Sequence, residues 1–216
     1  MLVDHFPLLG LRLRTPRLEL RLPSAEELAA LAELAAGGIH DAGVMPFAVP
    51  WTDQAPEEVA RSVVLHHWRE LGAWRPDDWT LLLAVFLDGA VVGVQSVGAR
   101  DLAVRREVAT GSWLGRRYQG QGIGTEMRAA VLHLAFGGLD VQDATSAAFL
   151  DNHASEAVSR KLGYRPDGIE RHVLRDALVI AGRMRLSRVE WERHRSVAVT
   201  VEGLEPCLPL MGVPAS

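Results

Sequence analysis

The sequence predicts a mixed α/β domain built on one central β-sheet. Helix-like segments with one apolar face and strand-like segments follow one another along the 216 residues, and no internal repeat or low-complexity block interrupts them. The dipeptide Asp88-Gly89 separates two apolar, β-rich runs and predicts a tight hairpin turn. A hydrophobic content of 48% with 23% charged residues is ordinary for a folded protein of this length. We therefore expect a single domain over residues 1–216.

The first elements carry clear local signals. Residues 17–22 alternate apolar and polar side chains, which predicts a strand buried on one face. Ser24-Ala-Glu-Glu27 forms a capping box that opens a helix over about residues 25–36. Pro56 favours the start of a second helix, over about residues 57–71. The segment 39–56 between these helices is rich in Pro, Gly and aromatic residues and predicts a structured loop.

The remaining elements follow from apolar period and turn residues. We expect strands at about 79–87, 90–97, 107–114, 143–150, 168–174 and 177–186, and helices at about 125–136, 154–162 and 189–194. A loose tail rich in Pro and Gly should follow, in which residues 197–201 could form an additional strand. An exposed strand there could pair across a dimer, so we also predict a homo-oligomer.

Composition excludes several function classes. A net charge of -4 provides no general attraction to nucleic acid or to an anionic membrane. No apolar run is long enough to span a membrane, and the N-terminus lacks a basic segment followed by a long apolar core, so we expect a cytoplasmic protein. Cys207 is the single cysteine; it cannot form an internal disulfide, it has no nearby zinc ligands, and we expect it to pack in the core. No metal is expected.

The segment Gln119-Gly-Gln-Gly-Ile-Gly-Thr125 follows an expected strand and leads into an expected helix. Glycines at alternate positions leave backbone N–H groups accessible, and the helix adds its unpaired first-turn donors and the positive end of its dipole. This pattern predicts a site for a phosphate or pyrophosphate. A nucleoside-triphosphate P-loop is excluded because no lysine follows Gly124, and a dinucleotide fold expects G-x-G-x-x-G early in a βαβ run.

The phosphate loop and the Asn152-His-Ala-Ser155 segment at a later helix start resemble the GNAT superfamily of CoA-dependent N-acyltransferases. That family's loop is Gln/Arg-x-x-Gly-x-Gly/Ala, and Gln119, Gly122 and Gly124 occupy its positions. Three further segments resemble its RimJ/RimL-type branch: Thr15-Pro-Arg-Leu-Glu-Leu-Arg, Lys161-Leu-Gly-Tyr164 and Arg185-Leu-Ser-Arg-Val-Glu-Trp191. The resemblance covers about residues 14–194, which would form the core, and leaves about 195–216 as a C-terminal extension.

The resemblance implies a GNAT fold, with a mostly antiparallel sheet, one splayed parallel strand pair and helices on both faces. It also implies an acyl-CoA donor, acetyl-CoA by default and succinyl-CoA in some branch members, that lies in the gap between the splayed strands. Strand-edge groups of Ser112, Trp113 and Leu114 would pair with the pantetheine arm. The other expected CoA contacts are Arg116, Arg117, Gln119, Gly120, Gln121, Gly122, Ile123, Gly124, Thr125, Asn152 and Ser155, with Arg160 and Lys161 weaker candidates for the CoA 3′-phosphate.

Catalysis in the resembled family is direct attack by an amine on the thioester. Ser155 would protonate the departing thiolate, or its hydroxyl would only form a hydrogen bond at the helix start. Many RimJ/RimL-like proteins carry a glutamate where this chain has Ala109. Glu107, two residues earlier on the same strand face, could serve as a base through water, or it could be a solvated strand-end charge. His40, Asp41 and His172 are further candidates that are more typical of structural residues.

The expected function is therefore acyl transfer from CoA to a primary amine of a protein or small molecule. A non-catalytic acyl-CoA sensor is the alternative, which the missing glutamate favours and which binding without turnover would reveal. A structural module whose glycine loop is only a turn is a second alternative, and it would bind no CoA species. The acceptor is not encoded by any motif.

Overall fold

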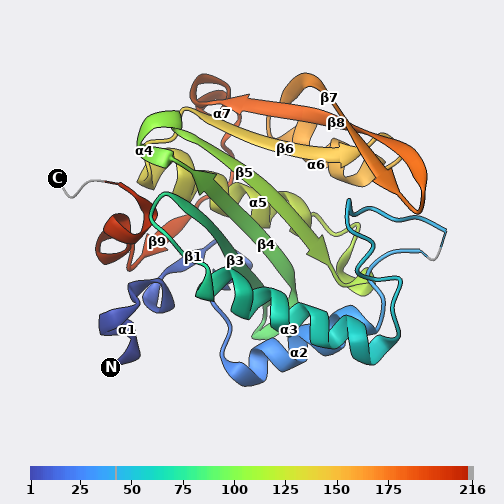
Figure 1. Cartoon of the computed structure of the whole chain (residues 1–216). Helices are drawn as coiled ribbons and strands as arrows, with labels where there is room; N and C mark the ends of the chain where they lie inside the picture. Colours follow the sequence, from blue (N-terminus) through green and yellow to red (C-terminus); the bar gives the residue numbers. More distant parts are fainter. Residues whose placement is uncertain (42, 214–216) are drawn as a thin grey trace.

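The computed structural model of the protein describes residues 1–41 and 43–213. Nine strands form one sheet in the order β7-β8-β6-β5-β4-β3-β2-β1-β9, and every neighbouring pair is antiparallel except β5 and β6 (Figure 1). The mixed α/β fold with a mostly antiparallel sheet is confirmed. The strands are β1 Arg12–Arg14, β2 Leu18–Arg21, β3 Asp78–Leu87, β4 Ala90–Arg100, β5 Glu107–Leu114, β6 Asp143–Phe149, β7 Arg165–Leu174, β8 Ala177–Ser187 and β9 Thr200–Glu202.

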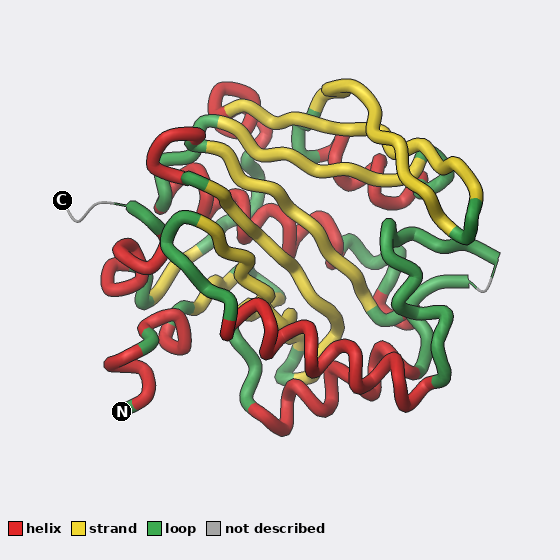
Figure 2. Tube along the Cα trace, in the orientation of Figure 1, coloured by secondary structure: helices red, strands yellow, loops and turns green. Residues whose placement is uncertain are grey.

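Helices cover both faces of the sheet, as Figure 2 shows in red against the yellow strands. Two of them, α2 (Ala25–Ala36) and α3 (Pro56–Gly72), lie side by side on one face. On the other face lies α5 (Ile123–His133), which continues into a π-helical turn, with α6 (His153–Lys161) packed against it. The shorter helices are α1 Leu2–His5, α4 Leu102–Arg105 and α7 Arg188–His194. No helix in the described part of the chain is both long and apolar enough to cross a membrane.

Local signals in the sequence place the first helix and the hairpin as expected. The Ser24 hydroxyl accepts a hydrogen bond from the Glu27 N–H at 3.2 Å, and the Glu27 carboxylate accepts from the Ser24 N–H at 2.8 Å. Both halves of the capping box are therefore formed. Asp88 and Gly89 have φ values of 50° and 79°, the left-handed geometry of a two-residue hairpin turn between β3 and β4.

An ion pair beside this capping box makes stability depend on acid pH. Arg21 donates to the Glu27 carboxylate at 2.6 Å and lowers the pKa of Glu27 from 4.5 to about 2. Because the folded-state pKa is depressed, this contribution to stability is complete above about pH 4.5 and is lost as the pH falls through about 2. We expect urea unfolding of Glu27→Gln to show a weaker loss of stability across that window than wild type.

The control for this experiment is Glu26→Gln, which removes a carboxylate from the same helical turn and leaves the Arg21–Glu27 pair intact. Its stability should fall with acid as in wild type. An equally steep loss in Glu27→Gln would show that this pair does not set the acid dependence.

The C-terminal extension is a docked part of the fold, so the expectation of a loose tail is wrong for residues 195–213. Strand β9 pairs with β1 of its own chain, and the following 3₁₀ turn Glu205–Met211 buries Cys207 and Met211 completely. The indole N–H groups of Trp74 and Trp79 donate to the carbonyls of Leu210 and Met211 at 2.8 and 3.2 Å. These contacts come from positions more than 130 residues away, and the tail's sequence has no period that reveals them.

The same observations bear on two other expectations. Packing of Cys207 in the core is confirmed. The additional strand lies at Thr200–Glu202 and uses one side to pair with β1, while its other side is an edge of the sheet. A homo-oligomer formed through this edge stays a prediction.

Candidate functional site

A gap opens between β5 and β6, the two parallel strands at the centre of the sheet. Their main chains pair only over Glu107–Ala109 with Asp143–Thr145, although β5 continues to Leu114 and β6 to Phe149. Figure 1 shows the two strands diverging beyond this short stretch. The Thr110 hydroxyl, which donates to the Thr145 carbonyl at 3.1 Å, marks the closed end of the gap.

The β5 side of the gap presents unpaired backbone groups. The Gly115 N–H donates to Val92 of β4, and the Gly111 carbonyl accepts from β4 side chains, so the odd-numbered residues of β5 are directed to β4. Alternation along a strand then directs the backbone groups of Thr110, Ser112 and Leu114 into the gap. An extended chain that carries amide groups can pair with such an edge like an additional strand.

The predicted phosphate loop lies directly at the open end of this edge. Gly120 and Gly122 have φ values of 71° and 77°, a conformation that favours glycine. A Cβ atom at Gly120 would meet no atom within 4 Å, so the space beside the loop is open. Helix α5 begins at Ile123, two residues before the expected start, with Gly122 as an N-cap that makes no side-chain hydrogen bond. The first-turn N–H groups are therefore available to an anion.

Gln119 connects the phosphate loop to the strand that precedes it. Its side-chain amide donates to the Leu114 carbonyl at 2.9 Å and to the Ile39 carbonyl at 2.7 Å. Gln119 thus fixes the end of β5 and the aromatic loop that follows α2 against the phosphate loop. Both contacts use an N–H donor at this position, which glutamine supplies here.

Arg17 and Glu126 hold the loop from the other side, and sequence reasoning missed both. Glu126, 8% exposed, accepts from the Thr15 hydroxyl at 2.6 Å and from Arg17 Nε at 2.7 Å. Arg17 also donates to the Gln121 carbonyl at 3.3 Å, and its guanidinium lies 3.6 Å from the place of a Cβ atom on Gly122. The two residues are 109 positions apart, and no local signal connects them.

Four basic residues were candidates for phosphate binding, and the structure separates them. Arg116 pairs with Asp41, and Arg160 pairs with Glu156 at 2.7 Å. Arg117 lies over the Tyr118 ring at 4.8 Å. Neither Arg117 nor the exposed Lys161 forms an ion pair with a carboxylate in the described part of the chain. These two are the cations most available to a phosphorylated ligand.

Asn152 and Ser155 lie at the start of α6, which follows the open end of β6. The Asn152 side-chain oxygen accepts from the Ser155 N–H at 3.1 Å, the geometry of an N-cap. The Ser155 hydroxyl is half-buried and makes no hydrogen bond with the described residues. The structure therefore brings both residues to the mouth of the gap, with one hydroxyl unengaged.

The structure does not bring Glu107 into the open part of the gap. It lies in the paired stretch of β5, where its carboxylate accepts from Arg185 at 2.6 Å and from Arg105 at 3.1 Å. The other base candidates are also engaged: the His40 ring nitrogens contact Thr52 and the Asp41 carbonyl, and His172 lies 3.3 Å from Glu170. No base is therefore identified by geometry.

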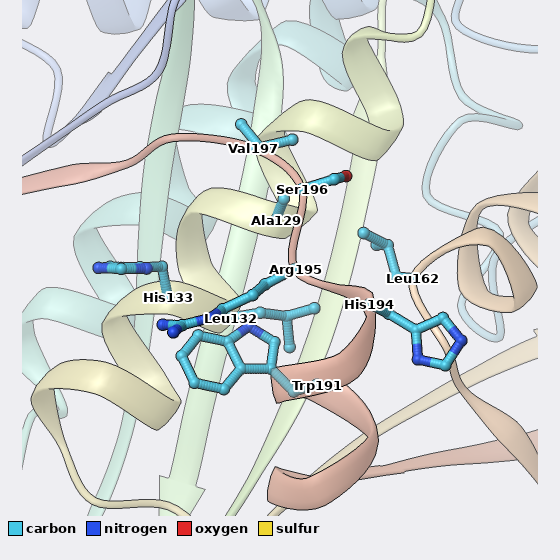
Figure 3. A pocket seen from close by; sticks show the side chains of 9 residues that line it. All are labelled: Ala129, Leu132, His133, Leu162, Trp191, His194, Arg195, Ser196 and Val197. Carbon is cyan, nitrogen blue, oxygen red and sulfur yellow. The ribbon is translucent and has the colours of Figure 1, made fainter.

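Two cavities in the described structure lie away from the gap. A space of about 10 Å³ between α5 and α7, lined by His133 and Trp191 among others, is about the size that one water needs (Figure 3). A groove of about 750 Å³ lies between α2, the β3–β4 turn and the arginines before the phosphate loop. No group of three His, Cys, Asp or Glu side chains among residues 1–41 and 43–213 is placed to hold a metal ion.

Comparison with known proteins agrees with this geometry. A family profile described as an acetyltransferase (GNAT) domain matches residues 17–165, which contain the gap, the phosphate loop and the Asn152–Ser155 segment. The chain belongs to the GNAT acetyltransferase family. This membership supports acetyl transfer from acetyl-CoA.

Solved GNAT structures share the fold at low sequence identity. RimJ from Mycobacterium smegmatis in complex with a CoA disulfide is 20% identical, with a TM-score of 0.67 over 85% of this chain and 90% of that chain. RimL, a ribosomal L7/L12 α-N-protein acetyltransferase solved with coenzyme A, is 21% identical, with a TM-score of 0.64 over 80% and 95%. A GNAT acetyltransferase from Bacillus anthracis is 16% identical, with a TM-score of 0.64 over 82% and 99%. These neighbours are consistent with the expected RimJ/RimL-type branch.

Proposed function

We propose that the protein transfers an acetyl group from acetyl-CoA to a primary amine by direct attack. One observation carries the proposal: the unpaired edge of β5 ends directly at the open glycine loop. The edge suits the amide-containing pantetheine arm and the loop suits the pyrophosphate, so a single CoA molecule would occupy both. The residues present therefore fit this donor.

The gap residues would hold the donor in three parts. The backbone groups of Ser112 and Leu114 would bind the arm along the edge, whereas those of Trp113, expected to pair there too, are directed to β4. An N–H in this stretch would also polarise the thioester oxygen. Gln119 to Thr125 would bind the pyrophosphate, helped by Arg117 and, on release from its ion pair with Asp41, by Arg116. Asn152, Ser155 and Lys161 would contact the donor from α6. Acetyl-CoA, when bound, supplies an activated acyl group that an amine can accept without a covalent enzyme intermediate.

The acceptor would approach from the sheet face opposite α5. There Trp113 lies 6.1 Å from Trp51, which packs on Phe47 at 5.2 Å between ring centroids. Asp53 of the same loop pairs with Arg175 at the β7–β8 turn at 2.6 Å, so the loop and the hairpin together bound the approach. Since neighbours with this fold include a protein N-terminal acetyltransferase, we propose a protein N-terminus as the acceptor.

Turnover measurements test the proposal directly. Release of the CoA thiol would be measured with acetyl-CoA as the donor. A separate measurement with succinyl-CoA would test whether the protein also accepts a larger acyl group. The acceptors would be peptides with a free N-terminus, the same peptides blocked at the N-terminus but containing lysine, and small amines. Binding without turnover on any amine would favour the sensor alternative, and absence of binding would show that the glycine loop is only a turn.

Ser155→Ala should lower kcat by about 100-fold if the Ser155 hydroxyl protonates the departing thiolate. The affinity for acetyl-CoA should change little, because the N-cap bond uses the Ser155 backbone N–H and survives the substitution. The matched control is Ser62→Ala on α3, whose hydroxyl bonds only the Val59 carbonyl. An unchanged kcat in Ser155→Ala would remove this residue from the mechanism.

A further inference from the structure

Arg128, on the face of α5 that packs against β5 and α6, is buried without an anionic partner. Its side chain is 4% exposed, and its guanidinium donates to the Ser159 hydroxyl at 2.8 Å and to the Ser112 hydroxyl at 3.5 Å. The Nε atom has no hydrogen-bond partner among residues 1–41 and 43–213. No carboxylate of the described chain lies within 4.0 Å of the guanidinium nitrogens. Arg128 is therefore a buried positive charge held by two neutral hydroxyl groups.

The groups around Arg128 do not supply a compensating charge. Tyr164 is buried beside it and bonds the Thr110 hydroxyl at 3.3 Å, and burial raises the pKa of Tyr164, so its phenol stays neutral. On α5 itself, Glu126 is engaged by Arg17, and on α6, Glu156 pairs with Arg160. Burial lowers the pKa of Arg128, but a guanidinium in a protein keeps its proton. An uncompensated buried charge is costly, which suggests that a ligand completes the site.

If the ligand is the proposed donor, the position of Arg128 indicates which part of CoA would contact its guanidinium. Ser112 belongs to the open part of β5, and the gap closes at Thr110, two residues toward the N-terminus. CoA carries its sulfur at the opposite end of the arm from the pyrophosphate. With the pyrophosphate at the loop after Leu114, an arm that follows the β5 edge brings the sulfur toward the closed end, where the guanidinium lies.

We propose that Arg128 stabilises the negative charge of the CoA thiolate as it departs. In the transfer the amine nitrogen forms a bond to the acyl carbon and the carbon–sulfur bond breaks with its electron pair on sulfur. The proton lost by the amine finally resides on that sulfur. Arg128 moves no proton; it donates a charge-assisted hydrogen bond to the sulfur, directly or through the hydroxyl of Ser112 or Ser159. The inference rests on the proposed function.

The test measures the pKa of the CoA thiol when bound, from the ultraviolet absorbance of the thiolate, without any turnover. In wild type we expect the bound thiol to have a pKa at least one unit below that of free CoA in the same buffer, which means that the site binds the thiolate at least tenfold more tightly than the thiol. Arg128→Met should return this pKa to that of free CoA or above, and Arg128→Lys should retain part of the shift. Arg69→Met, at the exposed surface of α3 on the other face of the sheet, should match wild type.

Desulfo-CoA, which lacks the sulfur, separates the possible failures. Its affinity should be the same in wild type and in Arg128→Met if the variant folds. Equal pKa values of the bound thiol in wild type and Arg128→Met would overturn the inference. A bound thiol in wild type with the same pKa as free CoA would also overturn it, and that measurement requires no variant. Loss of succinyl-CoA affinity in Arg128→Met with an unchanged thiol pKa would assign the guanidinium to an acyl carboxylate and also overturn it. If wild type binds neither CoA nor desulfo-CoA, the proposed function itself fails.

Discussion

Gly122→Glu is expected to abolish the thermal stabilisation that acetyl-CoA gives to the wild-type protein. The substitution places a carboxylate in the loop where the pyrophosphate would bind, beside first-turn N–H groups that the pyrophosphate needs. Donor at about 100 times its Kd stabilises a folded protein by about 2.7 kcal/mol. For a chain of this size that corresponds to a rise in Tm of roughly 5–10 °C, which thermal unfolding with and without acetyl-CoA would resolve.

Gly89→Glu is the matched control, because it introduces the same charge at a glycine with nearly the same backbone angle. Gly89 has φ +79° against +77° for Gly122, and a Cβ atom there meets nothing within 4 Å. Both variants should lose some intrinsic stability from the strained angle. Only Gly122→Glu should lose the response to acetyl-CoA. A full response in that variant would place the pyrophosphate elsewhere.

Met211→Ala should destabilise the protein by about 2–5 kcal/mol, although it lies near the end of a segment that looks unstructured in the sequence. The Met211 side chain is completely buried, so its removal leaves a cavity next to Trp79 in the core. The expected fall in Tm is roughly 5–15 °C. The additional stabilisation by acetyl-CoA should persist, because Met211 is not part of the gap.

Leu210→Ala is the control for this prediction, since Leu210 is only half-buried in the same turn. We expect a loss of about 1 kcal/mol, measured by urea unfolding alongside Met211→Ala. Similar small effects in both variants would mean that the C-terminal turn contributes little to the folded state.

Most elements of this fold could be predicted because their causes are local. The capping box at Ser24 and the Asp88-Gly89 turn each need only a few consecutive residues, and both form as expected. Strand β5, Glu107–Leu114, has the bounds predicted from the sequence, because a short β-rich run is followed there by a glycine and two arginines. The phosphate loop is equally local, since alternate glycines between a strand and a helix suffice to create it.

The sequence by itself therefore determined the fold class, the phosphate loop and, through its family motifs, the expected donor. Tertiary structure alone decided where β5 and β6 diverge and that the C-terminal turn packs against the core. It also decided that Glu107 forms an ion pair with Arg185, at a position outside the open gap. It also placed Arg128 between Ser112 and Ser159, which come from a different strand and helix. The reason is physical: burial and ion pairing depend on which distant segments meet, and no short stretch of sequence carries that information.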